Sequence, residues 1–180
     1  RRHLFLSASN IPALQPEPNS FYNLHRMRAE YRIVNFIDEN DNDQKKLYTW
    51  NDLGRELFDN HYKITDKEKK TVNGYLSDLG VAGGGNEFEN IKKIENGIKN
   101  NIVQYAYLEY EDADNIDTIM SHKAATPSGY IKLFAACFAQ GGVKAQLGLA
   151  NDQRLHSFDS RCENWDNMNN YIFYFPNLKK

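Results

Sequence analysis

The sequence predicts an α+β domain in which a central helix packs on an antiparallel sheet. A continuous apolar stripe at helical spacing follows Asn86, and a second apolar helix is expected from Ser128. Two segments are expected to form strands of that sheet, Val143–Ala150 and Tyr171–Phe175. The hydrophobic fraction of 41% and the aromatic fraction of 13% are typical of a globular protein with a substantial core.

The first 36 residues lack a helical pattern. Prolines mark residues 1–18 and disfavour a helix there. The alternation in Arg26–Phe36 favours a half-buried strand, and the polar residues 38–44 favour a loop. We therefore expect residues 1–36 to be the tail of a preceding β-rich domain or a linker, and residues 45–180 to be the core domain.

Three helix starts can be placed from capping residues. Thr49 precedes apolar residues that share one helical face, and Thr65 forms a capping box with Glu68. Gly83–Gly85 breaks the pattern, after which Asn86 caps the helix that carries the apolar stripe. We expect this stripe to face the core, with the Glu and Lys side chains of the same helix on the opposite face.

Acidic residues gather shortly before the central helix. Carboxylate oxygens are the ligands that Ca²⁺ prefers, but the spacing is not that of a calcium-binding loop. We favour a solvated acidic loop, followed by a short helix over Asn115–Ser121. The acidic residues are Glu109, Glu111, Asp112, Asp114 and Asp117.

Charge and composition exclude several classes of protein. The formal net charge is −2 and no run of Lys and Arg forms a basic stripe, so we expect no nucleic-acid partner. No apolar run approaches the ~20 residues of a membrane span. Two cysteines do not make a disulfide framework, and Cys137 is expected to be a buried thiol of the central helix. We expect no cofactor and no metal.

The stretch TPSGYIKLFAACFAQGGVKAQ, residues 126–146, carries a small-residue apolar helix and a G-V-K-A turn. It resembles the core of the transglutaminase-like family, whose members share a papain-like fold. Residues 91–107, which lead from a helix into a strand, resemble the segment before the family's nucleophile. Residues 8–18 resemble the tail of a domain of unknown function that precedes such cores in bacterial multidomain proteins.

The family places a cysteine at the start of the helix, a histidine near the start of a later strand and an aspartate after the next strand. A helix N-terminus favours the thiolate, and the histidine acts as base. The resemblance aligns the cysteine position with Pro127, beside Ser128, and the histidine position with Asn170. Thr126 suits the N-cap and Pro127 the first helical position. An amide cannot take a proton at pH 7, and the aspartate position lies beyond Lys180.

Other residues are weaker candidates for catalysis or metal binding. Ser128 would need a base in hydrogen-bond reach before it could act as a nucleophile. His156, Asp159 and Cys162 could form a displaced catalytic set or a metal site, although we favour a solvated loop there.

The remaining histidines and the last strand are expected to serve the packing of the domain. His61 and His122 are isolated and read as surface or packing residues. One aromatic face of the strand from Tyr171 is expected to pack on the helix from Ser128. Its other face could line a cleft, but burial on both faces is favoured.

The resemblance implies a catalytically inactive transglutaminase-like domain with a binding or scaffolding role in a larger bacterial protein. Its ligand would be an unidentified peptide, protein or carbohydrate, and its location the periplasm or cell surface. We expect the chain to be a fragment, truncated at the C-terminal end of its core. Two alternatives stay open: an active cysteine or serine hydrolase with relocated residues, and an inter-domain spacer.

Overall fold

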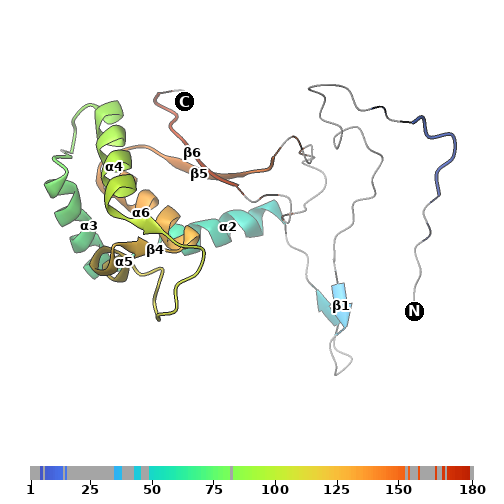
Figure 1. Cartoon of the computed structure of the whole chain (residues 1–180), viewed down its shortest axis with the longest axis horizontal. Helices are drawn as coiled ribbons and strands as arrows, with labels where there is room; N and C mark the ends of the chain where they lie inside the picture. Colours follow the sequence, from blue (N-terminus) through green and yellow to red (C-terminus); the bar gives the residue numbers. More distant parts are fainter. Residues whose placement is uncertain are drawn as a thin grey trace.

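The computed structural model describes residues 5, 7–13, 15, 35–37, 43–45, 49–81, 83–152, 154, 158, 165, 168 and 170–178. Within them it combines helices with short sheets (Figure 1). In chain order the elements are β1 (Asn35–Ile37), β2 (Asp43–Lys45), α2 (Trp50–His61), α3 (Asp66–Asp78), α4 (Glu87–Asn101), β3 (Val103–Gln104), α5 (Ile116–His122), β4 (Ala124–Ala125), α6 (Pro127–Gln140), β5 (Gln146–Ala150) and β6 (Asn170–Tyr174).

Helix α6 lies at the centre of the described fold. It packs against α2, α3, α4 and α5, and Figure 1 shows it, in orange, surrounded by these helices. Residues 133–138 of α6 are all buried, as expected for a helix that is apolar on every side. The mixed helix-and-sheet architecture agrees with the predicted α+β class.

The predicted helix starts are confirmed. Thr49 and Asp52 form a reciprocal capping box at α2, and Thr65 and Glu68 form the predicted one at α3. The side chain of Asn86 accepts hydrogen bonds from two backbone N–H groups in the first turn of α4. These local bonds explain why the chain enters each helix where it does.

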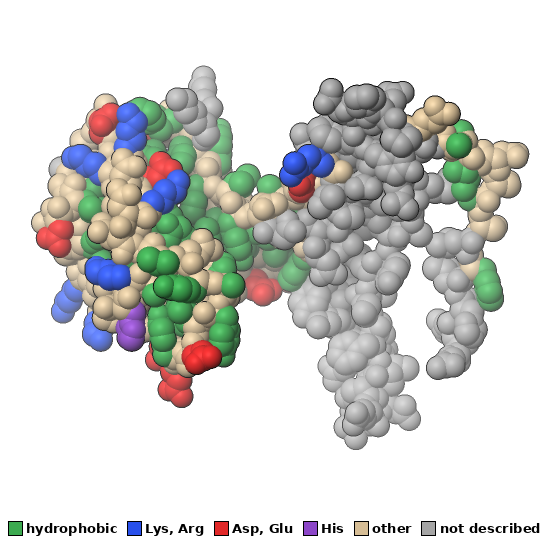
Figure 2. Space-filling view, viewed as in Figure 1, with side chains coloured by type: hydrophobic (Ala, Val, Ile, Leu, Met, Phe, Trp, Pro, Cys, Tyr) green, Lys and Arg blue, Asp and Glu red, His purple; other side chains and the backbone are tan. Residues whose placement is uncertain are grey.

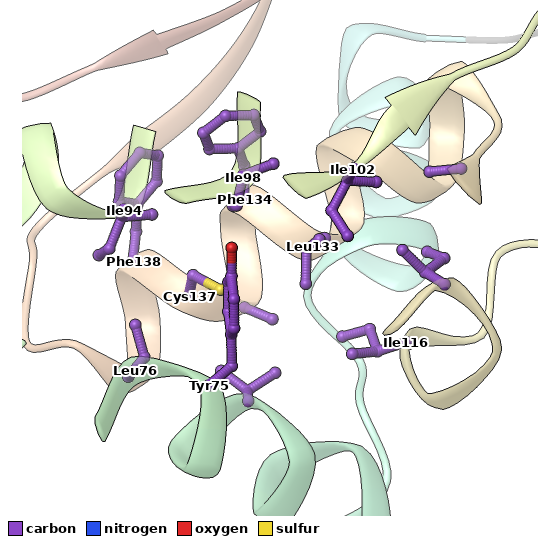
Figure 3. Close-up of a cluster of buried hydrophobic side chains, with 14 of the residues drawn as sticks. Tyr75, Leu76, Ile94, Ile98, Ile102, Ile116, Leu133, Phe134, Cys137 and Phe138 are labelled. Atoms are coloured by element: carbon purple, nitrogen blue, oxygen red, sulfur yellow. The ribbon is translucent and has the colours of Figure 1, made fainter. Parts of the chain in front are cut away.

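One hydrophobic core joins α3, α4, α5 and α6. Ile94 and Ile98 of α4 are fully buried against α6, so the stripe after Asn86 faces the core as predicted. Figure 3 shows the Cys137 sulfur directed into this cluster beside Tyr75. Cys137 is fully buried, which confirms it as a core thiol. Buried side chains of this kind supply most of the free energy of folding.

The described strands form three two-stranded sheets. β5 and β6 pair antiparallel, with Gln146 opposite Tyr174 and Ala150 opposite Asn170. The short strands β3 and β4 pair in parallel and connect the end of α4 to the start of α6. β1 and β2 pair antiparallel, so the last two residues of the segment 38–44, which was predicted to be a loop, belong to a strand.

The strand predicted from Val143 begins later, at Gln146. The N–H of Val143 donates to the carbonyl of Phe138, and Gly142 takes the left-handed conformation that ends α6. The buried Val143 side chain closes this turn over the core instead of entering the ladder.

The prediction that the last strand is buried on both faces is wrong. Tyr171, Ile172 and Tyr174 are each between 38% and 49% exposed. Only the face that carries Phe173 packs on α6, where its ring contacts those of Phe134 and Phe138. Among the described elements no layer covers the second face of the β5–β6 pair.

The acidic loop is only partly solvated, contrary to the prediction. Glu109, Glu111 and Asp112 are exposed, whereas Asp114 and Asp117 are partly buried and bonded. Asp117 accepts a hydrogen bond from Thr71 of α3, and Lys67 lies 3.2 Å from its carboxylate. Asp117 therefore ties this end of the loop to α3, whereas Asp114 accepts a hydrogen bond from Thr126 just before α6. Within the described residues no acidic or His/Cys cluster suits a metal ion.

None of the helices in the described part of the chain combines the length and apolar character needed to cross a membrane. On the face shown in Figure 2, cationic and anionic side chains are interspersed over the helical part of the fold.

Candidate functional site

The start of α6 is fixed by local bonds that the sequence made predictable. Thr126 is the N-cap, and its hydroxyl oxygen accepts from the N–H of Gly129 at 3.0 Å. Pro127 occupies the first helical position, where its missing N–H costs nothing. The Thr126 hydroxyl also donates to the carboxylate of Asp114, so the acidic loop is tied to the helix start.

The first residues of β6 contact β5 and the end of α2. Asn170 opens the strand opposite Ala150, and the next residue, Tyr171, contacts the ring of His61 at 5.3 Å between centroids. His61 is buried at the end of α2, with Nδ1 3.0 Å from the carbonyl oxygen of Leu57. Because a carbonyl only accepts, Nδ1 carries the proton, and His61 acts as a packing residue that supports Tyr171.

A cavity of about 570 Å³ lies between α4, α6 and β6. Pro127 at the start of α6 and Asn170 at the start of β6 both line it. The described lining residues are Ile91, Glu95, Lys99, Gln104, Pro127, Tyr130, Ile131, Phe134, Phe138, Asn170, Tyr171, Phe173 and Phe175. The two positions that the resemblance assigned to the nucleophile and the base therefore open onto one space.

Aromatic rings make up much of the cavity lining. Phe138 meets Phe173 and Phe175 edge to face, each at 5.2 Å between ring centroids. Tyr130 meets Phe134 in the same manner, also at 5.2 Å. Rings in this arrangement gain from the attraction between the positive edge of one and the negative face of the next. The wall is thus a connected and well-packed group.

Polar groups also line the cavity. Lys99 and Glu95 form an ion pair one turn apart on α4, and this bond raises the pKa of Lys99. Burial raises the pKa of the nearby Tyr130, and the charge of Lys99 partly opposes the rise. Lys99 and Glu95 keep the exposure predicted for the charged side chains of this helix, and both also line the cavity with Ile91.

The described lining residues offer no cysteine, serine, threonine or histidine. Ser128 lies in the first turn of α6 but is not among them. Cys137 sits on the same helix inside the core, where burial raises the pKa of its thiol to about 12 (Figure 3). A thiol with that pKa is almost entirely protonated at pH 7 and is inert as a nucleophile.

The remaining candidates divide into two groups. His122 stacks on the ring of Tyr110 at 4.5 Å, as a packing histidine does. His156, Asp159 and Cys162 lie outside the described residues, so the displaced catalytic set stays a prediction. Sequence reasoning missed Glu95, Lys99 and Tyr130 as cavity residues; the spacing of Ile91, Glu95 and Lys99, four residues apart, is the signal that places them on one face of α4.

Comparison of the chain with models of protein families, with characterised proteins and with solved structures finds no match. The case for function therefore rests on the geometry of the site and on the resemblance of its motifs.

Proposed function

We propose that this domain is a catalytically inactive relative of the transglutaminase-like enzymes, with a papain-like core, and that its cavity binds a ligand for a larger bacterial protein. The observation that carries the proposal is that Pro127 and Asn170 line one cavity. The resemblance assigned these two residues to the catalytic thiol and imidazole from separate stretches of sequence.

A thiol and its base must approach within hydrogen-bond reach, so their positions must open onto the same space. Helix α6 and strand β6 meet this requirement, since each contributes its first residue to the cavity. Proline has no ionisable group, and an asparagine amide cannot accept a proton at pH 7. The arrangement thus supports a site whose shape is kept and whose chemistry is lost.

The open cavity favours binding over a spacer role. Its volume of about 570 Å³ lies within the range of small-molecule sites, and it combines apolar walls with a few polar groups. A domain that only separates its neighbours would gain stability by filling such a space with side chains. The resemblance further suggests a periplasmic or cell-surface setting, in which peptides and carbohydrates are available as ligands.

Nuclear magnetic resonance titration of the ¹⁵N-labelled 180-residue chain tests the proposal. The panel consists of N-acetylglucosamine, glucose and N-acetylated amino-acid amides, each raised to millimolar concentration. The Ile131→Trp variant fills the cavity, because Ile131 lies on its wall. The matched control is Ile172→Trp, since Ile172 is 49% exposed on β6 and is not among the described lining residues.

We expect at least one class of probe to shift backbone signals of Tyr130 and Tyr171 saturably in the wild type and the control. Ile131→Trp should abolish these shifts while the rest of the spectrum keeps its dispersion. If no class of probe binds, or if Ile131→Trp binds as well as the wild type, the cavity is not a binding site and the spacer role gains support.

A further inference from the structure

We infer that the ligand of this cavity enters with a planar aromatic ring. This inference rests on the proposed function and adds the chemical class of the group that is bound. It is drawn from the arrangement of four phenylalanines and two tyrosines around the cavity, together with the state of its charged groups. The rings are Tyr130, Phe134, Phe138, Tyr171, Phe173 and Phe175.

The packing of the wall favours an aromatic guest over an aliphatic one. Phe138 makes T-shaped contacts with two neighbours at interplanar angles of 76° and 88°. Each ring in such a group presents a positive edge and a negative face, and a further ring can join the group in the same geometry. A saturated ring of the same size would gain the apolar contact alone.

Tyr171 provides a lining ring that is held in place before a ligand binds. Its side chain is 38% exposed, whereas the His61 ring that supports it is 98% buried. Nδ1 of His61 is bonded to the backbone of α2, which limits rotation of the imidazole. A ring held in place before binding loses little conformational entropy when a ligand stacks against it.

The charged groups do not favour a charged ligand. Lys99 and Glu95 neutralise each other, and both are partly exposed to water. A carboxylate or an ammonium group on the ligand would have to break the Lys99–Glu95 ion pair, and one of these two side chains would then lose its partner. The Tyr130 hydroxyl and the Gln104 side chain, which both belong to lining residues, can form neutral hydrogen bonds, which suits an uncharged ring with one polar substituent.

An aromatic ring could come from a peptide side chain or from a free small molecule. The test compares N-acetyl-phenylalanine amide with N-acetyl-cyclohexylalanine amide, which has the same backbone and a saturated ring, and with p-cresol as a free ring. Dissociation constants are measured by the same resonance titration on the full chain. The Phe173→Leu variant removes the ring that contacts both Phe134 and Phe138. Phe58→Leu is the matched control, because Phe58 is 55% exposed on α2 and is not among the described lining residues.

We expect the phenylalanine amide to bind roughly two- to tenfold more tightly than its saturated analogue, in the wild type and in Phe58→Leu. Phe173→Leu should reduce this ratio towards one while the folded spectrum persists. Tighter binding of p-cresol than of the amide would support the inference and assign a free molecule as the source; the reverse order would support it and assign a peptide.

Equal binding of the saturated and aromatic amides, or an unchanged ratio in Phe173→Leu, would overturn the inference. Binding of sugars alone would overturn it as well and leave the proposed function intact. Failure of every probe would overturn both.

Discussion

Glu68 allows the sharpest quantitative prediction, because one buried carboxylate joins three helices. Its side chain is 1% exposed and caps α3 through the N–H of Thr65. It also accepts from the N–H of Ile116 at the start of α5 and from Lys132 of α6 at 2.8 Å. Lys132 is itself largely buried, and among the described residues Glu68 is its only ion-pair partner. Glu68→Gln therefore leaves the Lys132 ammonium without an opposite charge.

The loss in free energy of unfolding that Glu68→Gln should cause follows from the pKa of Glu68. Burial acts to raise this pKa, but the bonds from Lys132, Thr65 and Ile116, together with the charge of Lys132, outweigh burial and hold it at about 2 instead of 4.5. A tenfold change in acidity equals about 1.4 kcal/mol, so the ionised carboxylate contributes about 3 kcal/mol to the free energy of unfolding. Because folding lowers the pKa, this contribution is complete above pH 4.5 and is lost as pH falls towards 2. About 2 kcal/mol is gone by pH 3.

Urea unfolding followed by circular dichroism at pH 7, 5, 4 and 3 measures the effect. Glu68→Gln should be less stable than the wild type by about 3 kcal/mol at pH 7 and by about 1 kcal/mol at pH 3. Asp59→Asn is the control, because Asp59 is 53% exposed and its pair with Lys63 is worth under about 1 kcal/mol at any pH. A difference between wild type and Glu68→Gln that stays constant from pH 7 to pH 3 would refute the reasoning.

Three further predictions concern α6 and its surroundings. Iodoacetamide should label Cys137 only after unfolding, because its pKa is about 12; rapid labelling in native protein at pH 8, read by mass spectrometry, would contradict its burial. Gly129→Ala should lower the free energy of unfolding by about 1–2 kcal/mol, since a Cβ there would lie 2.9 Å from side chains of the acidic loop and α5. Gly74→Ala, with open space around it, should instead be neutral or stabilising by up to about 1 kcal/mol, and equal effects of the two would count against this packing. Thr126→Ala should cost about 1 kcal/mol in urea unfolding through the lost N-cap, and an unchanged midpoint would show that the cap contributes nothing.

Elements whose signals lie within a few consecutive residues could be predicted from the sequence. Thr65 and Glu68 signal a capping box within four residues, and Pro127 marks the start of α6 because its ring suits the first helical position. The apolar stripe of α4 likewise predicted its buried face.

Contacts between distant segments could not be predicted in this way. The ion pair of Glu68 with Lys132 joins residues 64 positions apart, and no local pattern indicates it. The exposure of Ile172 and Tyr174 depends on whether another layer covers the second face of the β5–β6 pair, which the sequence of the strand does not specify. The resemblance singled out Pro127 and Asn170 as vestigial positions but did not predict a cavity, and the contribution of Lys99 depends on the rotation of α4 against α6.

The proposed function requires that positions 127 and 170 are those of a lost thiol and its lost base. The most direct test installs them, as Pro127→Cys alone and as Pro127→Cys combined with Asn170→His. The alkylation rate of the introduced thiol is followed against pH by peptide-resolved mass spectrometry. We predict that the combined variant reacts with an apparent pKa at least about one unit below that of the single variant, because an imidazolium in the same cavity stabilises the thiolate. Coincident profiles near the free-thiol value of about 8.5 would show that the two positions do not form a vestigial catalytic pair.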